Sequence, residues 1–190
     1  MLPAFGTGIY QHYNHTVSPP SRSGAEFRRA LAQFATGVTI VTTRDAQARA
    51  VGVTANSFSS LSIEPPLVLW SLALVANSIG AFRACARFRI HVLGVAQLGI
   101  ADRFATRGAD KFAHGAWRDN RDGIPCLDDC VAWFECDNRS QYDEGDHVII
   151  VGRVVAFEVH GGTPLIFHAG RYVSGLAEAP LPRALRASAP

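Results

Sequence analysis

The sequence has few charged residues and no long apolar run. Charged side chains make up 18 % of its 190 residues, and the net charge at pH 7 is only +2. The basic residues are scattered, so the composition argues against a nucleic-acid partner. The longest apolar stretch, 67–76, is much shorter than the roughly 20 residues that span a bilayer. We therefore expect neither a nucleic-acid nor a membrane partner.

Cysteines are also few, and their spacing fits neither a disulfide framework nor a metal site. Three of the four lie within eleven residues, in a Cys-x3-Cys-x5-Cys pattern that matches no common zinc motif. The N-terminal stretch lacks the charged start and apolar run of a signal peptide. We expect no metal, and interpret the four as small buried residues in a reducing cytoplasm: Cys85, Cys126, Cys130 and Cys136.

Signatures of hydrolytic and Rossmann enzymes are absent as well. No Ser or Cys lies in a Gly-x-Ser-x-Gly elbow, and the adjacent acids at 128–129 and 143–144 are typical of solvated turns. No Gly-x-Gly-x-x-Gly follows a predicted strand, which argues against a tightly held dinucleotide on a doubly wound sheet. The side chains alone do not indicate hydrolysis.

The sequence predicts one globular domain between two tails. Hydrophobic residues make up 48 % of the chain, enough for a real core at this length. We place an N-terminal arm at 1–22, the domain at 23–176 and a C-terminal tail at 177–190. Phe5, Tyr10 and Tyr13 give the arm apolar side chains that either pack on a partner or stay mobile.

Periodicity indicates a mainly β fold with a few short helices. A capping box of Ser23 and Glu26 opens a helix that we expect to end at Gly37, and Asn77 or Ser78 can cap a second one. A roughly twenty-residue surface excursion is expected after Ala105. Helices are predicted at 79–85 and 97–105, and strands at 38–43, 50–53, 67–71, 88–93, 131–136, 147–159 and 164–172. Short strands without regular βαβ alternation favour a closed antiparallel barrel with helices at its ends.

Small polar side chains concentrate in residues 51–71, beside two hydrophobic runs. They are Thr54, Asn56, Ser57, Ser59, Ser60, Ser62 and Ser71. Such a segment offers backbone N–H groups and short donors to a phosphate or a planar polar ring, without bulk in the way. The same composition also fits an ordinary polar loop between strands. The residues alone leave both interpretations open.

Three further positions are candidates for a binding site. Asn77 and Ser78 follow a strand, where they can bind an anion at a helix start or simply cap the helix. Lys111 places a cation on the excursion, where it either neutralises a phosphate or is solvated. His147, in Gly-Asp-His, opens a strongly apolar strand at the mouth of the barrel. There it either donates to a carboxamide or phosphate, or bonds the backbone.

Several ordered segments resemble the flavin reductase family. Thr-Ala-Asn-Ser-Phe-Ser-Ser-Leu-Ser with a following Pro-Pro is similar to its flavin-binding loop, and Gly-Asp-His opens a segment similar to a closing strand. The similarity covers roughly residues 25–175, through the segments 34–43, 52–66, 88–97, 104–112, 145–154 and 164–172. One departure is His91, which stands where the family commonly has a small or amide residue, so a contact at the flavin edge is expected to differ.

The resemblance implies a split antiparallel β-barrel of the FMN-binding type that forms a homodimer and binds FMN or FAD. It places Thr54, Ala55, Asn56, Ser57, Ser59 and Ser60 along the flavin, and Ser71, Asn77, Ser78 and Lys111 toward its phosphate. It places His147 beside the nicotinamide as the catalytic residue. The choice between FMN and FAD is not resolved, because no adenine pocket can be read from the sequence. The choice between NADH and NADPH is also open, because the candidate partners of a 2′-phosphate, Arg89, Arg153 and Arg171, are not distinctive.

The implied activity is NAD(P)H-dependent reduction of flavin, by hydride transfer from nicotinamide C4 to flavin N5. The ring positioning that this needs suits a chain without catalytic acid–base pairs. The reduced flavin would leave for a partner flavin-dependent monooxygenase in the cytoplasm. Two alternatives stay open: a flavoprotein of this fold that reduces a corrinoid or ferric complex, and a flavin-binding module without turnover.

Overall fold

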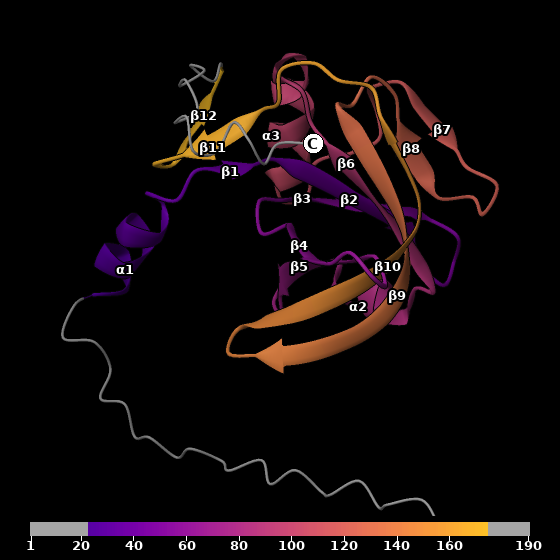
Figure 1. Cartoon of the computed structure of the whole chain (residues 1–190), viewed down its shortest axis with the longest axis horizontal. Coiled ribbons are helices and arrows are strands. Elements are labelled where there is room, and N and C mark those ends of the chain that lie inside the picture. The colour runs from indigo at the N-terminus through magenta and orange to yellow at the C-terminus, as the bar shows by residue number, and fades with distance from the viewer. Residues whose placement is uncertain (1–22, 175–190) are drawn as a thin grey trace, which may run out of the picture.

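The structure is a computed structural model that describes residues 23–174. The predicted N-terminal arm, with Phe5, Tyr10 and Tyr13, and the tail at 177–190 lie outside the described residues. Every strand pairing is antiparallel, as predicted. A seven-stranded sheet with the order β3-β2-β6-β9-β10-β5-β4 forms the body of the molecule (Figure 1). Its strands are β2 (Thr39–Arg44), β3 (Ala50–Ala55), β4 (Ser59–Ser62), β5 (Leu67–Ala73), β6 (Arg87–Val92), β9 (Ala132–Glu144) and β10 (His147–Val159).

The inner face of this curved sheet encloses the main hydrophobic core. Strand β5 shows the alternation expected for a sheet with one face in the core, and every second residue from Val68 is buried. Residues from the two ends of the sheet meet in this core, since Ala55 of the edge strand β3 packs in the same cluster as Trp70 of β5, the strand next to the opposite edge. The two edge strands β3 and β4 follow each other in the chain and stand at opposite ends of the strand order.

Helix α2 (Ile79–Ala84) packs against the inner face of the sheet. Phe82 is fully buried and meets Trp70 edge to face, with ring centroids 4.9 Å apart. The amide of Asn138 on β9 donates to the carbonyls of Phe82 (2.8 Å) and Cys85 (3.0 Å), which satisfies groups that the end of the helix leaves free. This helix therefore has a fixed position relative to the barrel.

A second core lies on the outer face of β2, beneath helix α3 (Leu98–Ala105). Ile40 and Phe104 are fully buried in it, together with Leu165 from near the C-terminal end. The 3-10 helix η1 (Val95–Gln97) leads into α3. Strands β1 (Thr36–Gly37), β11 (Ile166–His168) and β12 (Arg171–Val173) form a small sheet, and β7 (Trp117–Asp119) and β8 (Pro125–Leu127) form a hairpin. Because both faces of β2 are covered, its first five residues are all buried.

Several predictions of the elements were wrong in detail. Helix α1 has the predicted capping box but spans only Gly24–Leu31, and Gly37 lies in β1. The polar stretch after residue 58 includes an edge strand, β4. The surface excursion contains the β7–β8 hairpin, of which residues 124–127 are buried. The single strand predicted at 164–172 is two strands, because Ala169 and Gly170 both adopt positive φ in a tight turn.

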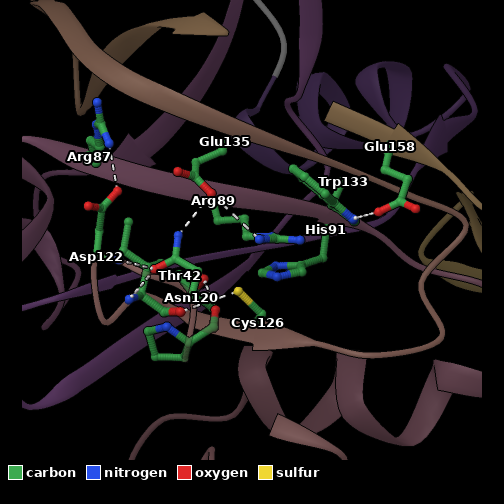
Figure 2. Close-up of polar contacts among 12 residues, drawn as sticks. Thr42, Arg87, Arg89, His91, Asn120, Asp122, Cys126, Trp133, Glu135 and Glu158 are labelled. Atoms are coloured by element: carbon green, nitrogen blue, oxygen red, sulfur yellow. Dashed lines mark hydrogen bonds and ion pairs between the residues drawn. The ribbon is translucent and has the colours of Figure 1, made fainter. Parts of the chain in front are cut away.

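A buried polar cluster ties the β7–β8 hairpin to the sheet, as Figure 2 shows. The guanidinium of Arg89 lies 3.6 Å over the ring of Trp133 and 3.6 Å from a carboxylate oxygen of Glu135. That carboxylate also accepts from the amide of Asn120 in the hairpin, at 2.8 Å. The side chains of Arg89 and Glu135 are largely buried, and buried charged groups need partners. The hairpin supplies one of these partners, Asn120. The cluster therefore fastens the hairpin over the outer face of β6 and β9.

His91 belongs to this structural region and is fully buried. Its Nε2 accepts from the backbone N–H of Leu127 at 3.2 Å, and its Nδ1 lies 3.1 Å from the carbonyl oxygen of Ile40. The only neutral tautomer that satisfies both contacts carries the proton on Nδ1. Both ring nitrogens are thus engaged by the backbone, and the expectation that His91 alters a contact at the flavin edge finds no support in this position.

Candidate functional site

A cavity of about 540 Å³ lies between β3, the loop that joins β5 to α2, and the segment after α3. Its apolar wall includes Val51, Val53 and Phe112, and its polar residues include Asn77 and Ser78. A volume of this size, with an apolar wall and a few polar groups, is typical of a small-molecule or cofactor site. It is larger than a second cavity that adjoins it.

One wall of the cavity depends on a very close approach between a strand and a helix. A Cβ atom on Gly52 would lie 2.5 Å from a ring carbon of Phe104 and 3.3 Å from Phe112. Phe104 is fully buried and stacks on Trp117, with centroids 5.2 Å apart. Only glycine allows β3 to lie this close to α3, and the approach fixes the spacing of the two elements that form the cavity.

Lys111 bridges the same two elements. Its ammonium donates to the carbonyl oxygens of Gly52 at 3.0 Å and Phe104 at 2.8 Å. The side chain is half-buried, so the expectation that Lys111 lies on an exposed excursion was wrong. Burial lowers the pKa of Lys111 below its ordinary value. An ammonium has three donors, so one N–H is left to meet an anion in the cavity. Lys111 therefore stabilises the wall and also gives it positive charge.

Arg107 lines the cavity too, and the sequence reasoning missed it. Its Nη2 lies 3.4 Å from the amide oxygen of Asn77, so the two side chains approach each other across the cavity. Together with Lys111 it outweighs the single acid of the lining, Asp110. The excess of positive charge favours an anionic ligand such as a phosphate. In sequence Arg107 is one exposed basic residue among many, and only the fold places it beside Asn77.

Part of the predicted flavin-binding loop is held in place by contacts within the protein. The hydroxyl of Thr54 donates to the carbonyl of Ala101 on α3 at 2.6 Å, and Ala55 is buried in the barrel core. The hydroxyl of Ser57 accepts from the backbone N–H of Ser71 at 2.9 Å and lies 3.2 Å from the carbonyl oxygen of the same residue. These contacts connect β3 to α3 and the loop to β5, so a ligand would meet a rigid segment.

The remaining predicted residues of the loop are exposed. Asn56, Ser59 and Ser60 are solvent-accessible, and the hydroxyl of Ser59 donates to the carbonyl of Ser60 at 3.3 Å. None of these three lines the cavity. Of the predicted binding residues, the cavity thus brings together Asn77, Ser78 and Lys111. The predicted residues that do not line it are Thr54, Ala55, Asn56, Ser57, Ser59, Ser60 and Ser71.

Asn77 and Ser78 do not cap α2 with their side chains. Ser78 occupies the N-cap position in a helical backbone conformation, and its hydroxyl makes no capping hydrogen bond. The oxygen of the Asn77 amide faces Arg107 instead. The side-chain capping bond expected of this pair is therefore absent, although Ser78 holds the N-cap position, and both residues line the cavity. Their binding of an anion stays a prediction.

His147 opens β10, as predicted, and lies outside the cavity lining. It pairs in register with Ala73 at the end of β5, two residues before Val75 enters the cavity wall. Its Nδ1 lies 2.6 Å from a carboxylate oxygen of Asp146, and the hydrogen bond between them lowers the pKa of Asp146. The side chain of His147 is 47 % exposed, so the imidazole is accessible to a ligand next to the cavity.

The described part of the chain contains neither a cluster of metal ligands nor a helix that could cross a membrane. Within residues 23–174 no three His, Cys, Asp or Glu side chains come together in a way that could hold a metal ion. The four cysteines are free thiols, and burial raises the pKa of Cys136 to about 12. None of the helices described is both long and apolar enough to cross a membrane.

A family model and the relatives found by comparison with known proteins all indicate the same family. Residues 31–176 match the model of the flavin reductase like domain. The chain is 45 % identical over 145 residues to a probable flavin reductase of Rhizobium meliloti, covering 76 % of this chain and 47 % of that protein. It is 40 % identical over 158 residues to the FMN reductase (NADH) SmoA of Agrobacterium fabrum, covering 83 % and 90 %.

A solved structure agrees with these similarities. The NADH:FAD oxidoreductase SgcE6 of Streptomyces globisporus, in complex with NAD and FAD fragments, superposes with a TM-score of 0.77 at 32 % identity. The match covers 82 % of this chain and 94 % of that one. The chain belongs to the flavin reductase like family, and the predicted mainly β, split-barrel fold is confirmed. It spans about half the length of the R. meliloti relative and most of SmoA.

Proposed function

We propose that this protein is an NAD(P)H:flavin oxidoreductase that supplies reduced FMN or FAD to a partner flavin-dependent monooxygenase. The observation that carries the proposal is the cavity between β3 and the segment after α3, in a chain of the flavin reductase like family. Flavin, when bound, accepts a hydride at N5 from C4 of the nicotinamide. The free cysteines fit the cytoplasmic location that we also propose.

The donors of the cavity fit a flavin phosphate and its polyol chain. Lys111 and Arg107 supply positive charge, while Asn77 and Ser78 supply an amide and a hydroxyl for the phosphate end. The apolar wall of Val51, Val53 and Phe112 suits uncharged parts of the ligand. We place the isoalloxazine toward the loop of Thr54, Ala55, Asn56, Ser57, Ser59 and Ser60, with Ser71 behind it. Backbone N–H groups of this loop would then stabilise the negative charge of reduced flavin.

His147 is the residue that we assign to the nicotinamide. Asp146 accepts a hydrogen bond from its Nδ1, which leaves Nε2 free to bond the carboxamide or a phosphate. Its half-exposed position beside the end of β5 suits a nucleotide that must arrive and leave in each cycle. Asp146 and His147 thus orient the donor nucleotide, and the reaction itself needs only the correct stacking of the two rings.

A homodimer is the assembly that we propose, and exposed apolar side chains support it. Phe27 and Phe34, in and just after α1, are 58 % and 78 % exposed, and Phe157 on β10 is 67 % exposed. Helix α1 has no buried residue and lies to one side of the barrel (Figure 1). Large exposed apolar side chains of this number are typical of protein interfaces rather than of a free surface.

We expect the His147→Ala variant to raise the KM for NADH about five- to tenfold, because a hydrogen bond is worth about 1 kcal/mol. The Kd for flavin should stay within about twofold of the wild-type value, since His147 lies outside the cavity that we assign to the flavin. Steady-state NADH oxidation and flavin fluorescence titration measure the two constants.

The His114→Ala variant is the matched control, because His114 is exposed and its side chain lines neither cavity. It should change neither constant. Loss of flavin affinity in His147→Ala would show that His147 supports the flavin site structurally. An unchanged KM would remove it from nicotinamide binding.

A further inference from the structure

A second cavity adjoins the first one. It has a volume of about 290 Å³ and lies between α2 and the turn that joins β2 to β3. Three residues, Val51, Asn77 and Ser78, line both cavities and form the boundary between them. A ligand whose phosphate lies at this boundary can therefore extend in both directions.

The two cavities differ in charge. The first contains Arg107 and Lys111 against one acid, so it carries an excess of positive charge. In the second the only charged residues are Asp45 and Arg49, whose side chains form an ion pair at 2.8 Å. The second cavity is thus close to neutral and suits an uncharged aromatic base better than another phosphate.

The β2–β3 turn forms a pre-organised wall of the second cavity. The carboxylate of Asp45 accepts from the backbone N–H groups of Gln47 (3.0 Å) and Arg49 (2.9 Å). Arg49 also donates to the side-chain oxygen of Gln47 at 3.3 Å, which directs the amide NH₂ group of Gln47 as the free donor. An amide of this kind can donate to a ring nitrogen of adenine without a cost in loop ordering.

The opposite wall leaves room for a planar ring. The α2 residues that line it are Gly80, Ala81 and Ala84, and none has a side chain longer than a methyl group. A Cβ on Gly80 would meet no atom within 4 Å. The space beside this helix is therefore open to a ligand and is not filled by the side chains of the protein.

From these observations we propose that the second cavity binds the adenosine half of FAD, so that the protein prefers FAD to FMN. The flavin half and its phosphate occupy the first cavity, the second phosphate passes Asn77 and Ser78, and the adenine lies between Gln47 and α2. This assignment rests on the proposed function, because it requires the first cavity to hold the flavin. NADH also contains an adenine, and the experiment below distinguishes binding of FAD from binding of NADH in this cavity.

The test is the Gly80→Phe variant of the full chain, which fills the second cavity. We expect wild-type protein to bind FAD at least about tenfold more tightly than FMN, which corresponds to about 1.4 kcal/mol from the additional contacts of the adenosine half. In Gly80→Phe the FAD preference should fall to about twofold, while the Kd for FMN stays unchanged. The Gln47→Ala variant should weaken FAD binding about fivefold and leave FMN binding unchanged.

Gly99→Phe is the matched control, since Gly99 lies in α3, has open space around it and lines neither cavity. Its FAD-to-FMN ratio should equal that of the wild type. Equal affinities for FAD and FMN in the wild type would overturn the assignment and leave the proposed function intact. A raised KM for NADH in Gly80→Phe, with an unchanged FAD-to-FMN ratio, would overturn it by assigning the cavity to the nicotinamide nucleotide. Failure of the wild type to bind either flavin would overturn both proposals.

Discussion

The Gly52→Val variant is expected to lose about 1–3 kcal/mol of unfolding free energy, because a side chain at this position overpacks the second core. Its Cβ would start 2.5 Å from Phe104, which is fully buried and is held by Trp117 and Phe112. The helix must move away from β3, and the two hydrogen bonds of Lys111 to both elements must lengthen. Flavin affinity should therefore fall by about tenfold or more.

Urea denaturation and flavin titration measure these two effects. The matched control is Gly37→Val, because Gly37 is also a strand glycine but is exposed, with no atom within 4 Å of an added Cβ. Its stability and flavin affinity should stay close to the wild-type values. Equal behaviour of the two variants would show that the close approach of β3 to α3 does not determine the shape of the cavity.

Acid is expected to destabilise the protein through His91, with a large and specific effect. Burial lowers the pKa of His91 to about 3, and the positive charge of Arg89 acts in the same direction, against the smaller effect of the contact with the carbonyl of Ile40. The unfolded chain has a histidine pKa near 6.5, so between pH 6.5 and about 3 it binds a proton that the folded chain does not. The free energy of unfolding therefore falls as the pH falls through this window.

Each pH unit below 6.5 should lower the free energy of unfolding by roughly 1.4 kcal/mol through His91. At pH 4.5 the loss from His91 alone should therefore be about 3 kcal/mol relative to neutral pH. The His91→Gln variant keeps one donor and one acceptor but cannot titrate, so its stability should fall less on acidification by about this amount. The exposed His114→Gln variant is the control and should follow the wild type. Parallel losses in all three proteins, measured by urea denaturation at both pH values, would contradict the account.

Local sequence patterns predicted the parts of the fold that depend on local rules. The capping box of Ser23 and Glu26, the whole of β10 and helix α3 follow from short-range hydrogen bonding and from periodicity. The full extent of β9 could not be predicted from such patterns, because its second half is polar where the strand leaves the core and pairs with β10. The β7–β8 hairpin was missed because distant residues, such as Arg89 and Glu135, stabilise it.

The candidate site was predictable only in part, for the same reason. The resemblance indicated Asn77, Ser78 and Lys111, and the fold brings these three into one cavity. The half-buried position of Lys111 could not be read from an excursion rich in Gly and Asp. Arg107 carried no signal at all, because its importance depends on a long-range approach to Asn77. Whether the exposed loop and His147 contact flavin and nicotinamide stays a prediction.

The most direct test of the proposed function is steady-state NADH oxidation by the purified chain with added flavin, followed by the loss of NADH absorbance. We expect turnover that saturates with free FMN and with free FAD and reaches its half-maximal rate at a lower concentration of FAD. Reduced flavin should then be released and consume oxygen in solution. Tight flavin binding without NADH oxidation would contradict the account, and would indicate a flavin-binding protein of the same fold without reductase activity.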